Sequence, residues 1–104
     1  AEMKAVMDKL RNRPINNIAG LPVVKFMDFS KSESKNIDGS VEVIDLPKTN
    51  VLKFMFSEDE WCCVRPSGTE PKLKIYVSVK EATQELAKTK NQNVLGFMEM
   101  LVNN

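Results

Sequence analysis

The pattern that most limits the fold is a regular alternation of apolar and polar residues near position 76. The apolar set is Leu73, Ile75, Val77 and Val79, and the polar set is Lys72, Lys74, Tyr76, Ser78 and Lys80. Because successive side chains of a strand point to opposite faces, this alternation predicts a β-strand with one face on a core and one polar face.

Three earlier segments also have extended character. Residues 51–56 place Leu52, Phe54 and Phe56 on one face, and residues 61–65 follow after the connection SEDE. This spacing predicts an antiparallel hairpin, although the connection has no glycine. Residues 23–29 form an earlier strand candidate. The polar stretch 30–40, SKSESKNIDGS, is expected to be an exposed loop, followed by a short or irregular extended piece over residues 41–46.

Helical spacing is found at both ends of the chain. The first apolar stripe consists of Met3, Val6, Met7 and Leu10, and Pro14 limits how far that helix can continue. Thr83 is a suitable N-cap for a closing helix. The apolar stripe expected for that helix is Leu86, Val94, Phe97, Met98, Leu101 and Val102. Together these elements predict an α+β fold with about four mostly antiparallel strands and two helices on one face of the sheet.

Length and charge narrow the classes of protein. With 104 residues, 42% of them hydrophobic, the chain is sized for one domain over residues 1–104. Its net charge of +1 and its short apolar runs argue against nucleic-acid and membrane partners. The chain opens on Ala1 and enters a helical pattern without a signal-peptide segment, so we expect a soluble, cytoplasmic piece of a longer protein.

Histidine is absent and the two cysteines, Cys62 and Cys63, are adjacent. In a strand their side chains point to opposite faces, so an intradomain disulfide is not expected. No set of four zinc ligands is available, and the usual Ser-His and Cys-His nucleophile arrangements are missing.

The turn RPSGTEP, over residues 65–71, is the main candidate for chemistry. Arg65 precedes a proline and is held extended at a strand end, while Ser67 and Thr69 present hydroxyls. Gly68 can adopt a positive φ if required and exposes amide N–H groups. Lys74 can reach the same place from the next strand. These donors suit one small anion, but an ordinary polar hairpin turn beside two surface lysines explains the composition as well.

The longer string RPSGTEPKLKIY, over residues 65–76, closely resembles the phosphate-binding signature of the α-D-phosphohexomutases. This is the family of phosphoglucomutases, phosphomannomutases and phosphoglucosamine mutases, and the signature lies in its C-terminal domain. The ending with Lys72, Lys74 and Tyr76 is most similar to the phosphoglucomutase branch. A weaker resemblance extends over IAGLPVVKFMDF, LPKTNVLKFMFSEDEW and the closing helix.

The resemblance implies roles for individual residues. The direct phosphate binders would be Arg65, Ser67, Gly68, Thr69 and Lys74, and the supporting residues would be Glu70, Lys72 and Tyr76. Lys74 stands where many members carry arginine, which keeps the charge but loses the two-pronged geometry. Glu70 is expected to hold the loop by accepting hydrogen bonds from the backbone or from Lys72. Trp61 is expected to serve in packing rather than in stacking on a sugar.

The resemblance also implies a fold and an activity. The fold would be the TATA-binding-protein-like arrangement of a four-stranded antiparallel sheet with two helices. In the four-domain mutases a phosphoserine and Mg²⁺ on other domains transfer a phosphoryl group on a hexose phosphate. The substrates would be glucose 1-phosphate, glucose 6-phosphate or their mannose analogues. The C-terminal domain would hold the phosphate that is not being transferred.

The chain has no Asp-x-Asp-x-Asp loop and no Thr-Ala-Ser-His context. We therefore expect it to contain no catalytic residue, no metal ligand and no cofactor, and to be inactive without the other domains. Two alternatives from other classes stay open. One is a free-standing module that binds phosphate, another anion or a nucleotide, and the other is a structural or interaction domain.

Overall fold

The structure is a computed structural model that describes residues 2–12, 15–70 and 72–103. It contains two helices and eight strands within those ranges. In chain order these are α1 (Glu2–Asn12), β1 (Asn17–Ile18), β2 (Leu21–Pro22), β3 (Lys25–Asp28), β4 (Glu33–Asn36), β5 (Val41–Val43), β6 (Leu52–Met55), β7 (Trp61–Pro66), β8 (Leu73–Ser78) and α2 (Gln84–Asn103).

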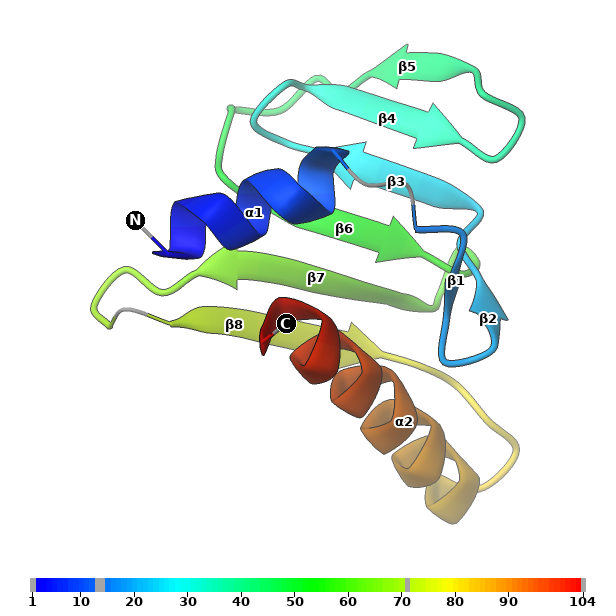
Figure 1. The fold of residues 1–104 in the computed structure, drawn as a ribbon. Coiled ribbons are helices and arrows are strands. Elements are labelled where there is room, and N and C mark those ends of the chain that lie inside the picture. The colour runs from blue at the N-terminus through cyan, green and yellow to red at the C-terminus, as the bar shows by residue number, and fades with distance from the viewer. Residues whose placement is uncertain (1, 13–14, 71, 104) are drawn as a thin grey trace.

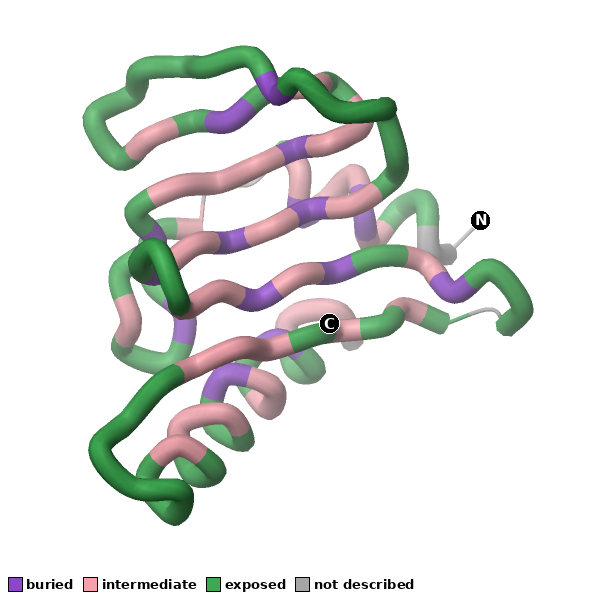
Figure 2. Tube along the Cα trace, turned by 180° about the vertical axis from the view of Figure 1, so that it is seen from behind, coloured by how far each residue is buried: buried purple, intermediate pink, exposed green. Residues whose placement is uncertain are grey.

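Six strands form one antiparallel sheet in the order β5-β4-β3-β6-β7-β8, and β1 pairs with β2 in a separate two-stranded ribbon. Both helices lie on the same face of the sheet, in front of it in Figure 1 and behind it in Figure 2. The predicted α+β class with two helices on one face is therefore confirmed. The opposite side of the sheet is called the helix-free face below.

The core lies between the helices and the middle of the sheet. Leu52 and Phe54 of β6 and Val64 of β7 are at most 1% exposed, and Met98 of α2 is fully buried. Buried and less buried residues alternate along the central strands, which Figure 2 shows as alternating purple and pink. The ring centroids of Phe26 and Phe54 lie 5.1 Å apart. This alternation is what made β6, β7 and β8 recognisable from the sequence.

The sheet is larger than the four strands expected from the sequence. The stretch 30–40, predicted to be a loop, contains strand β4, which pairs with both β3 and β5. Asp38 and Gly39 close the β4–β5 turn, with Gly39 at a φ of 91° and the Asp38 carboxylate accepting hydrogen bonds from Ser40. The helices do not extend over β4 and β5 (Figure 1), and β4 consists of polar residues only, so no apolar alternation marks that strand.

Helix α2 begins as predicted but buries a narrower stripe. The Thr83 hydroxyl accepts a hydrogen bond of 3.1 Å from the Leu86 amide, which is N-cap geometry. Leu86 itself is 52% exposed and Phe97 is 37% exposed, so the prediction that both lie in the core stripe was wrong. The first turns of α2 project past the sheet (Figure 1), which leaves Leu86 without a surface to cover. Neither helix, within its described residues, has the length and apolarity to cross a membrane.

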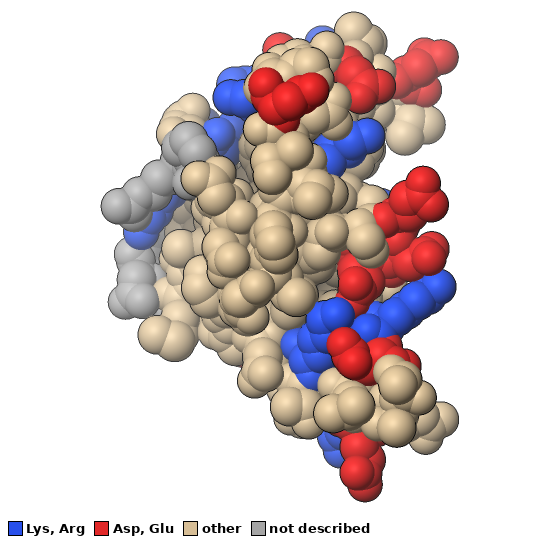
Figure 3. Space-filling view, turned by 90° about the vertical axis from the view of Figure 1, so that its right-hand side faces the viewer, with Lys and Arg blue, Asp and Glu red and all other residues tan. Residues whose placement is uncertain are grey.

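The β6–β7 hairpin is confirmed, and in the absence of a glycine the Ser57 side chain stabilises its turn. Its hydroxyl accepts hydrogen bonds from the amides of Asp59 and Glu60, at 3.4 and 3.2 Å. Glu60 then joins this turn to α2, because its carboxylate pairs with Lys90 and accepts a hydrogen bond from the Lys80 amide. Figure 3 shows acidic and basic side chains gathered at this end of the molecule, below a mostly uncharged middle.

The Glu60–Lys90 pair predicts a specific loss of stability in acid. Hydrogen bonding from Lys90 and from the Lys80 amide lowers the pKa of Glu60 below its ordinary value of 4.5. The stabilisation is therefore present above about pH 4.5 and is lost as the pH falls through the lower pKa of the folded state. We expect Glu60→Gln to cost about 1 kcal/mol of unfolding free energy at neutral pH and clearly less in acid, at about pH 3.

Urea unfolding of both proteins at the two pH values measures this difference. Glu58→Gln is the matched control, because Glu58 lies in the same exposed connection. An equal effect of Glu60→Gln at both pH values would show that the pair does not stabilise the fold through its charge.

Candidate functional site

The turn that carries the phosphate-binding resemblance connects β7 to β8 at one end of the sheet. Arg65 lies opposite Lys74, and Pro66 lies opposite Leu73, at the last positions of the β7–β8 ladder. Beyond the proline, the Ser67 amide donates a hydrogen bond of 2.9 Å to the Lys72 carbonyl, which closes the base of the turn. The geometry therefore fixes where each strand ends and where the turn begins.

The two cations of this ladder project from the helix-free face. Val64, the neighbour of Arg65, is fully buried in the core on the helix side. Because side chains alternate, Arg65 and its cross-strand neighbour Lys74 point to the opposite side. Both residues are exposed, and neither side chain has an ion-pair or hydrogen-bond partner within the described part of the chain. Two like charges directly opposite each other destabilise a sheet.

Ser67 organises the inside of the turn. It is only 8% exposed, and its Oγ accepts hydrogen bonds from the amides of Thr69 and Glu70, at 3.3 and 3.2 Å. Of the amides from residue 67 to residue 70, only that of Gly68 has no hydrogen-bond partner in the described structure. The set of free amide donors is thus smaller than the sequence suggested. The Ser67 hydroxyl proton can still be donated, because its oxygen serves here as the acceptor.

Gly68 is not required by the backbone of the turn. Its φ is not in the left-handed region that favours glycine, and a Cβ built at this position would meet no atom within 4 Å. The turn can therefore form with alanine in its place. The absence of a side chain leaves the free Gly68 amide open to close approach by a ligand.

Glu70 and Lys72 form an ion pair at the outer side of the turn, with 3.0 Å between Oε2 and Nζ. Their side chains are 58% and 61% exposed, so the pair itself adds little stability. Its consequence is electrostatic. The acid of the turn is paired with Lys72, which leaves the charges of Arg65 and Lys74 without a nearby neutralising partner.

A second row of side chains lies next to this pair on the helix-free face. Lys53, Cys63 and Tyr76 are cross-strand neighbours on β6, β7 and β8. Tyr76 is 44% exposed. The Lys53 ammonium lies 4.6 Å from the ring centroid of Trp61. Trp61 thus packs against a lysine on the helix-free face rather than within the main core. The sequence had not assigned a binding role to Lys53 or Cys63, although the place of Lys53 on the polar face of its strand was a usable signal.

The two cysteines are free and differ in environment. Cys62 is fully buried in the core, and burial raises the pKa of its thiol to about 12. Cys63, on the other face, is partly exposed. Burial raises the pKa of the Cys63 thiol too, while the positive charges of Lys53 and Arg65 act in the opposite direction. Neither thiol is activated as a nucleophile.

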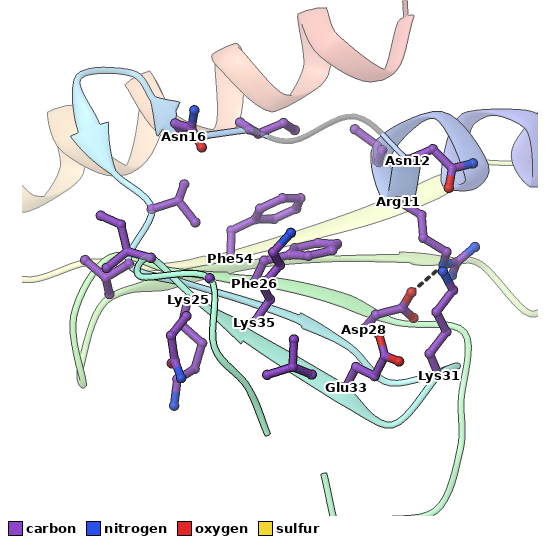
Figure 4. A pocket seen from close by; sticks show the side chains of 18 residues that line it. Arg11, Asn12, Asn16, Lys25, Phe26, Asp28, Lys31, Glu33, Lys35 and Phe54 are labelled. Atoms are coloured by element: carbon purple, nitrogen blue, oxygen red, sulfur yellow. Dashed lines mark hydrogen bonds and ion pairs between the residues drawn. The ribbon is translucent and has the colours of Figure 1, made fainter. Parts of the chain in front are cut away.

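A separate groove of about 570 Å³ lies on the helix side, between the end of α1 and strands β3 to β5. Figure 4 shows it with Phe26 and Phe54 inside and the Arg11–Asp28 ion pair at one end. None of the residues that the sequence assigned to phosphate lines this groove. Lys31 and Lys35 do line it, but they belong to the segment that the sequence had treated as a loop.

The structure brings the assigned residues together only around the β7–β8 turn. Arg65, Lys74, Ser67 and the Gly68 amide converge there by register and hydrogen bonding. Pro71 lies outside the described residues. Among the residues that are described, no group of three or more His, Cys, Asp or Glu side chains could hold a metal ion.

One known protein family matches most of the chain. The family model described as "Phosphoglucomutase/phosphomannomutase, C-terminal domain" matches residues 4–95. A protein named phosphoglucomutase from Staphylococcus saprophyticus is 35% identical over 100 residues, which cover 90% of this chain and 18% of the relative. No solved structure matches the chain significantly.

Two further relatives carry the same name. The Staphylococcus aureus protein is 41% identical over 80 residues, or 76% of this chain and 14% of the relative. The Staphylococcus haemolyticus protein is 42% identical over 79 residues, or 75% of this chain and 14% of the relative. The chain thus spans less than a fifth of the length of these relatives. It belongs to the phosphoglucomutase/phosphomannomutase family and corresponds to the C-terminal domain of that family.

Proposed function

We propose that this domain binds the phosphate group of a hexose phosphate within a phosphoglucomutase or phosphomannomutase, an isomerase that moves a phosphoryl group on its substrate. The direct ligands are Arg65, Ser67, Gly68, Thr69 and Lys74, and the supporting residues are Glu70, Lys72 and Tyr76. The domain grips the phosphate that is not being transferred and so positions the sugar for reaction on other domains.

The pairing of Arg65 with Lys74 is the observation that carries the proposal. Two unpaired cations directly opposite each other in a ladder raise the free energy of the unliganded sheet. A bound dianion removes that repulsion and gains two charge-assisted interactions at once. Because Lys72 is already neutralised by Glu70, the attraction is centred on the ladder pair.

The turn supplies shorter-range contacts to the same anion. The Gly68 amide and the Thr69 hydroxyl donate to phosphate oxygens, and the Ser67 hydroxyl donates its proton while its oxygen holds the turn. Arg65 provides a planar fork that matches two phosphate oxygens, whereas Lys74 contributes a single point charge. All of these groups stabilise charge and orientation, and none of them exchanges a proton with the reacting atoms.

The remaining parts of the reaction belong to other domains of the same polypeptide. The Mg²⁺ and the phosphoserine that the resemblance to the phosphohexomutases implies are proposed to lie there. The partners of this domain are the hexose phosphate and those domains. Glucose 1-phosphate, glucose 6-phosphate and their mannose analogues are the substrates considered, and the purified chain is expected to interconvert none of them.

An amide chemical-shift titration of the chain with inorganic phosphate tests this proposal. We expect weak binding, with the largest shifts at residues 65–70 and at Lys74. Gly68→Ala is the informative variant, because it can adopt the turn without strain yet places a methyl group beside the free amide. It should keep the stability of the chain within about 0.5 kcal/mol while lowering phosphate affinity about tenfold.

Gly96→Ala, at a position in α2 where an added Cβ also meets no atom within 4 Å, adds the same methyl group elsewhere and serves as the control. An unchanged spectrum of the turn at tens of millimolar phosphate would contradict the proposal. Interconversion of glucose 1-phosphate and glucose 6-phosphate by the purified chain would contradict the division of labour between domains.

A further inference from the structure

The helix-free face beside the turn has a chemistry that phosphate binding alone does not require. Strands β6, β7 and β8 contain no acidic residue. By strand alternation, all three of their basic residues point to the helix-free face: Lys53, Arg65 and Lys74. Two of them form the ladder pair at the turn. The third lies one row further along the sheet, in the row Lys53–Cys63–Tyr76.

From this arrangement we infer that the row Lys53–Cys63–Tyr76 contacts the sugar of the bound hexose phosphate, with Lys53 and Tyr76 as positioning residues. The inference rests on the proposed function, since it takes the phosphate to lie at Arg65 and Lys74. It adds a contact surface for the hexose ring, which the phosphate ligands do not provide.

The spacing of a sheet suits this assignment. Residues two apart on one strand lie about 6.6 Å from each other, and neighbouring strands lie about 4.8 Å apart. When a phosphate lies over the Arg65–Lys74 pair, the row Lys53–Cys63–Tyr76 is therefore about one sugar ring away from it. Cys63 has the shortest side chain in the row, so a ring above it meets Lys53 on one side and Tyr76 on the other.

The side chains of the row have the functional groups that a sugar needs. The Lys53 ammonium donates hydrogen bonds, and the Tyr76 hydroxyl can donate or accept them. Tyr76 is 44% exposed, and no ion pair or hydrogen bond occupies either side chain among the described residues. Contact with the Trp61 ring draws the Lys53 ammonium toward β7 on the side of Cys63 away from Arg65, where the edge of a hexose ring distant from the phosphate would lie. The charges of Lys53 and Arg65 both act on the Cys63 thiol, which places the two rows in one electrostatic environment.

Parallel titrations of the chain with inorganic phosphate and with glucose 1-phosphate test the inference. Both ligands should shift the amides of the turn, and glucose 1-phosphate should in addition shift those of Lys53, Cys63 and Tyr76. Lys53→Met keeps a long side chain over Trp61 but removes the donor, and Tyr76→Phe removes only the hydroxyl. Each should weaken glucose 1-phosphate about three- to tenfold and inorganic phosphate less than about twofold.

Lys35→Met is the matched control, because Lys35 lies on β4 of the same sheet but in the row of Phe26, Phe54 and Cys62, on the helix side. It should change neither affinity. The inference would be overturned if both ligands shift the turn, glucose 1-phosphate causes no additional shifts in the row, and the variants lose affinity for both ligands equally. That result would leave the phosphate proposal standing. The absence of turn shifts with either ligand would overturn both.

Discussion

Replacing Arg65 by alanine is expected to lower kcat/KM of the full-length enzyme about 10- to 100-fold, mainly through a higher KM. The variant would lose the proposed charge-assisted, two-pronged interaction with the phosphate, and one such interaction contributes about 1.5 to 3 kcal/mol. Because the phosphate that is not transferred is bound in both the ground state and the transition state, most of the loss appears in KM. Steady-state kinetics with glucose 1-phosphate measures the effect.

The same substitution should not destabilise the protein. Arg65 is exposed and faces Lys74 across the ladder, so its removal relieves repulsion in the unliganded sheet. We expect the unfolding free energy of Arg65→Ala to stay equal or to rise by a few tenths of a kcal/mol. This combination of lost binding and retained stability separates a ligand contact from a structural residue.

Arg65→Lys is a graded control, because it keeps the charge but removes the planar fork, and it should show an intermediate kcat/KM. Lys88→Ala, far from the turn on α2, should leave the kinetics unchanged. Unaltered kinetics in Arg65→Ala would instead favour a structural or interaction role for this domain.

The strands that the sequence predicted well are those that face the helices. Leu52, Phe54, Val64 and Val77 belong to sets of apolar residues at every second position, because one side of their strands covers the core. Strand β4 was missed for the opposite reason. It lies beyond both helices, and Glu33 and Lys35 project from it on the side where the core would be. A strand without a core to cover has no apolar period to detect.

The candidate turn was found by its residue types, but its internal hydrogen bonding was not. A Ser-Gly-Thr sequence suggests several free amides, whereas the buried Ser67 hydroxyl accepts two of them. The long-range pairs were equally hidden. Glu60 meets Lys90 thirty residues later, and Arg11 meets Asp28 seventeen residues later. Such partners are set by how helices dock on the sheet, which no local pattern encodes.

The Arg11–Asp28 pair gives the largest expected effect on stability. Asp28 is 3% exposed, and its carboxylate accepts a hydrogen bond of 2.8 Å from Arg11 Nε and two more from the amide and hydroxyl of Ser30. Arg11 also donates to Asn50, at 2.8 Å. The pair thus joins the end of α1 to β3 (Figure 4), and the bond to Asn50 joins Arg11 to the segment before β6. Asp28→Asn is expected to cost about 3 kcal/mol, because it removes the buried carboxylate beside the Arg11 guanidinium and leaves only the half-exposed Asp8 carboxylate, 3.2 Å from Nη1, as a countercharge.

Thermal unfolding would measure this cost as a decrease in Tm of about 15 °C for a domain of this size. Asp45→Asn, at an exposed position after β5, should change the unfolding free energy by less than about 0.5 kcal/mol. Equal effects of the two substitutions would show that the buried pair contributes no more than a surface carboxylate.

Because Asp28 lies on the helix side, opposite to Arg65 and Lys74, phosphate affinity of the folded variant should be unchanged. If the proposed phosphate site is correct, stability and ligand binding depend on different faces of the same sheet, and the Arg65→Ala and Asp28→Asn variants should each affect only one of them.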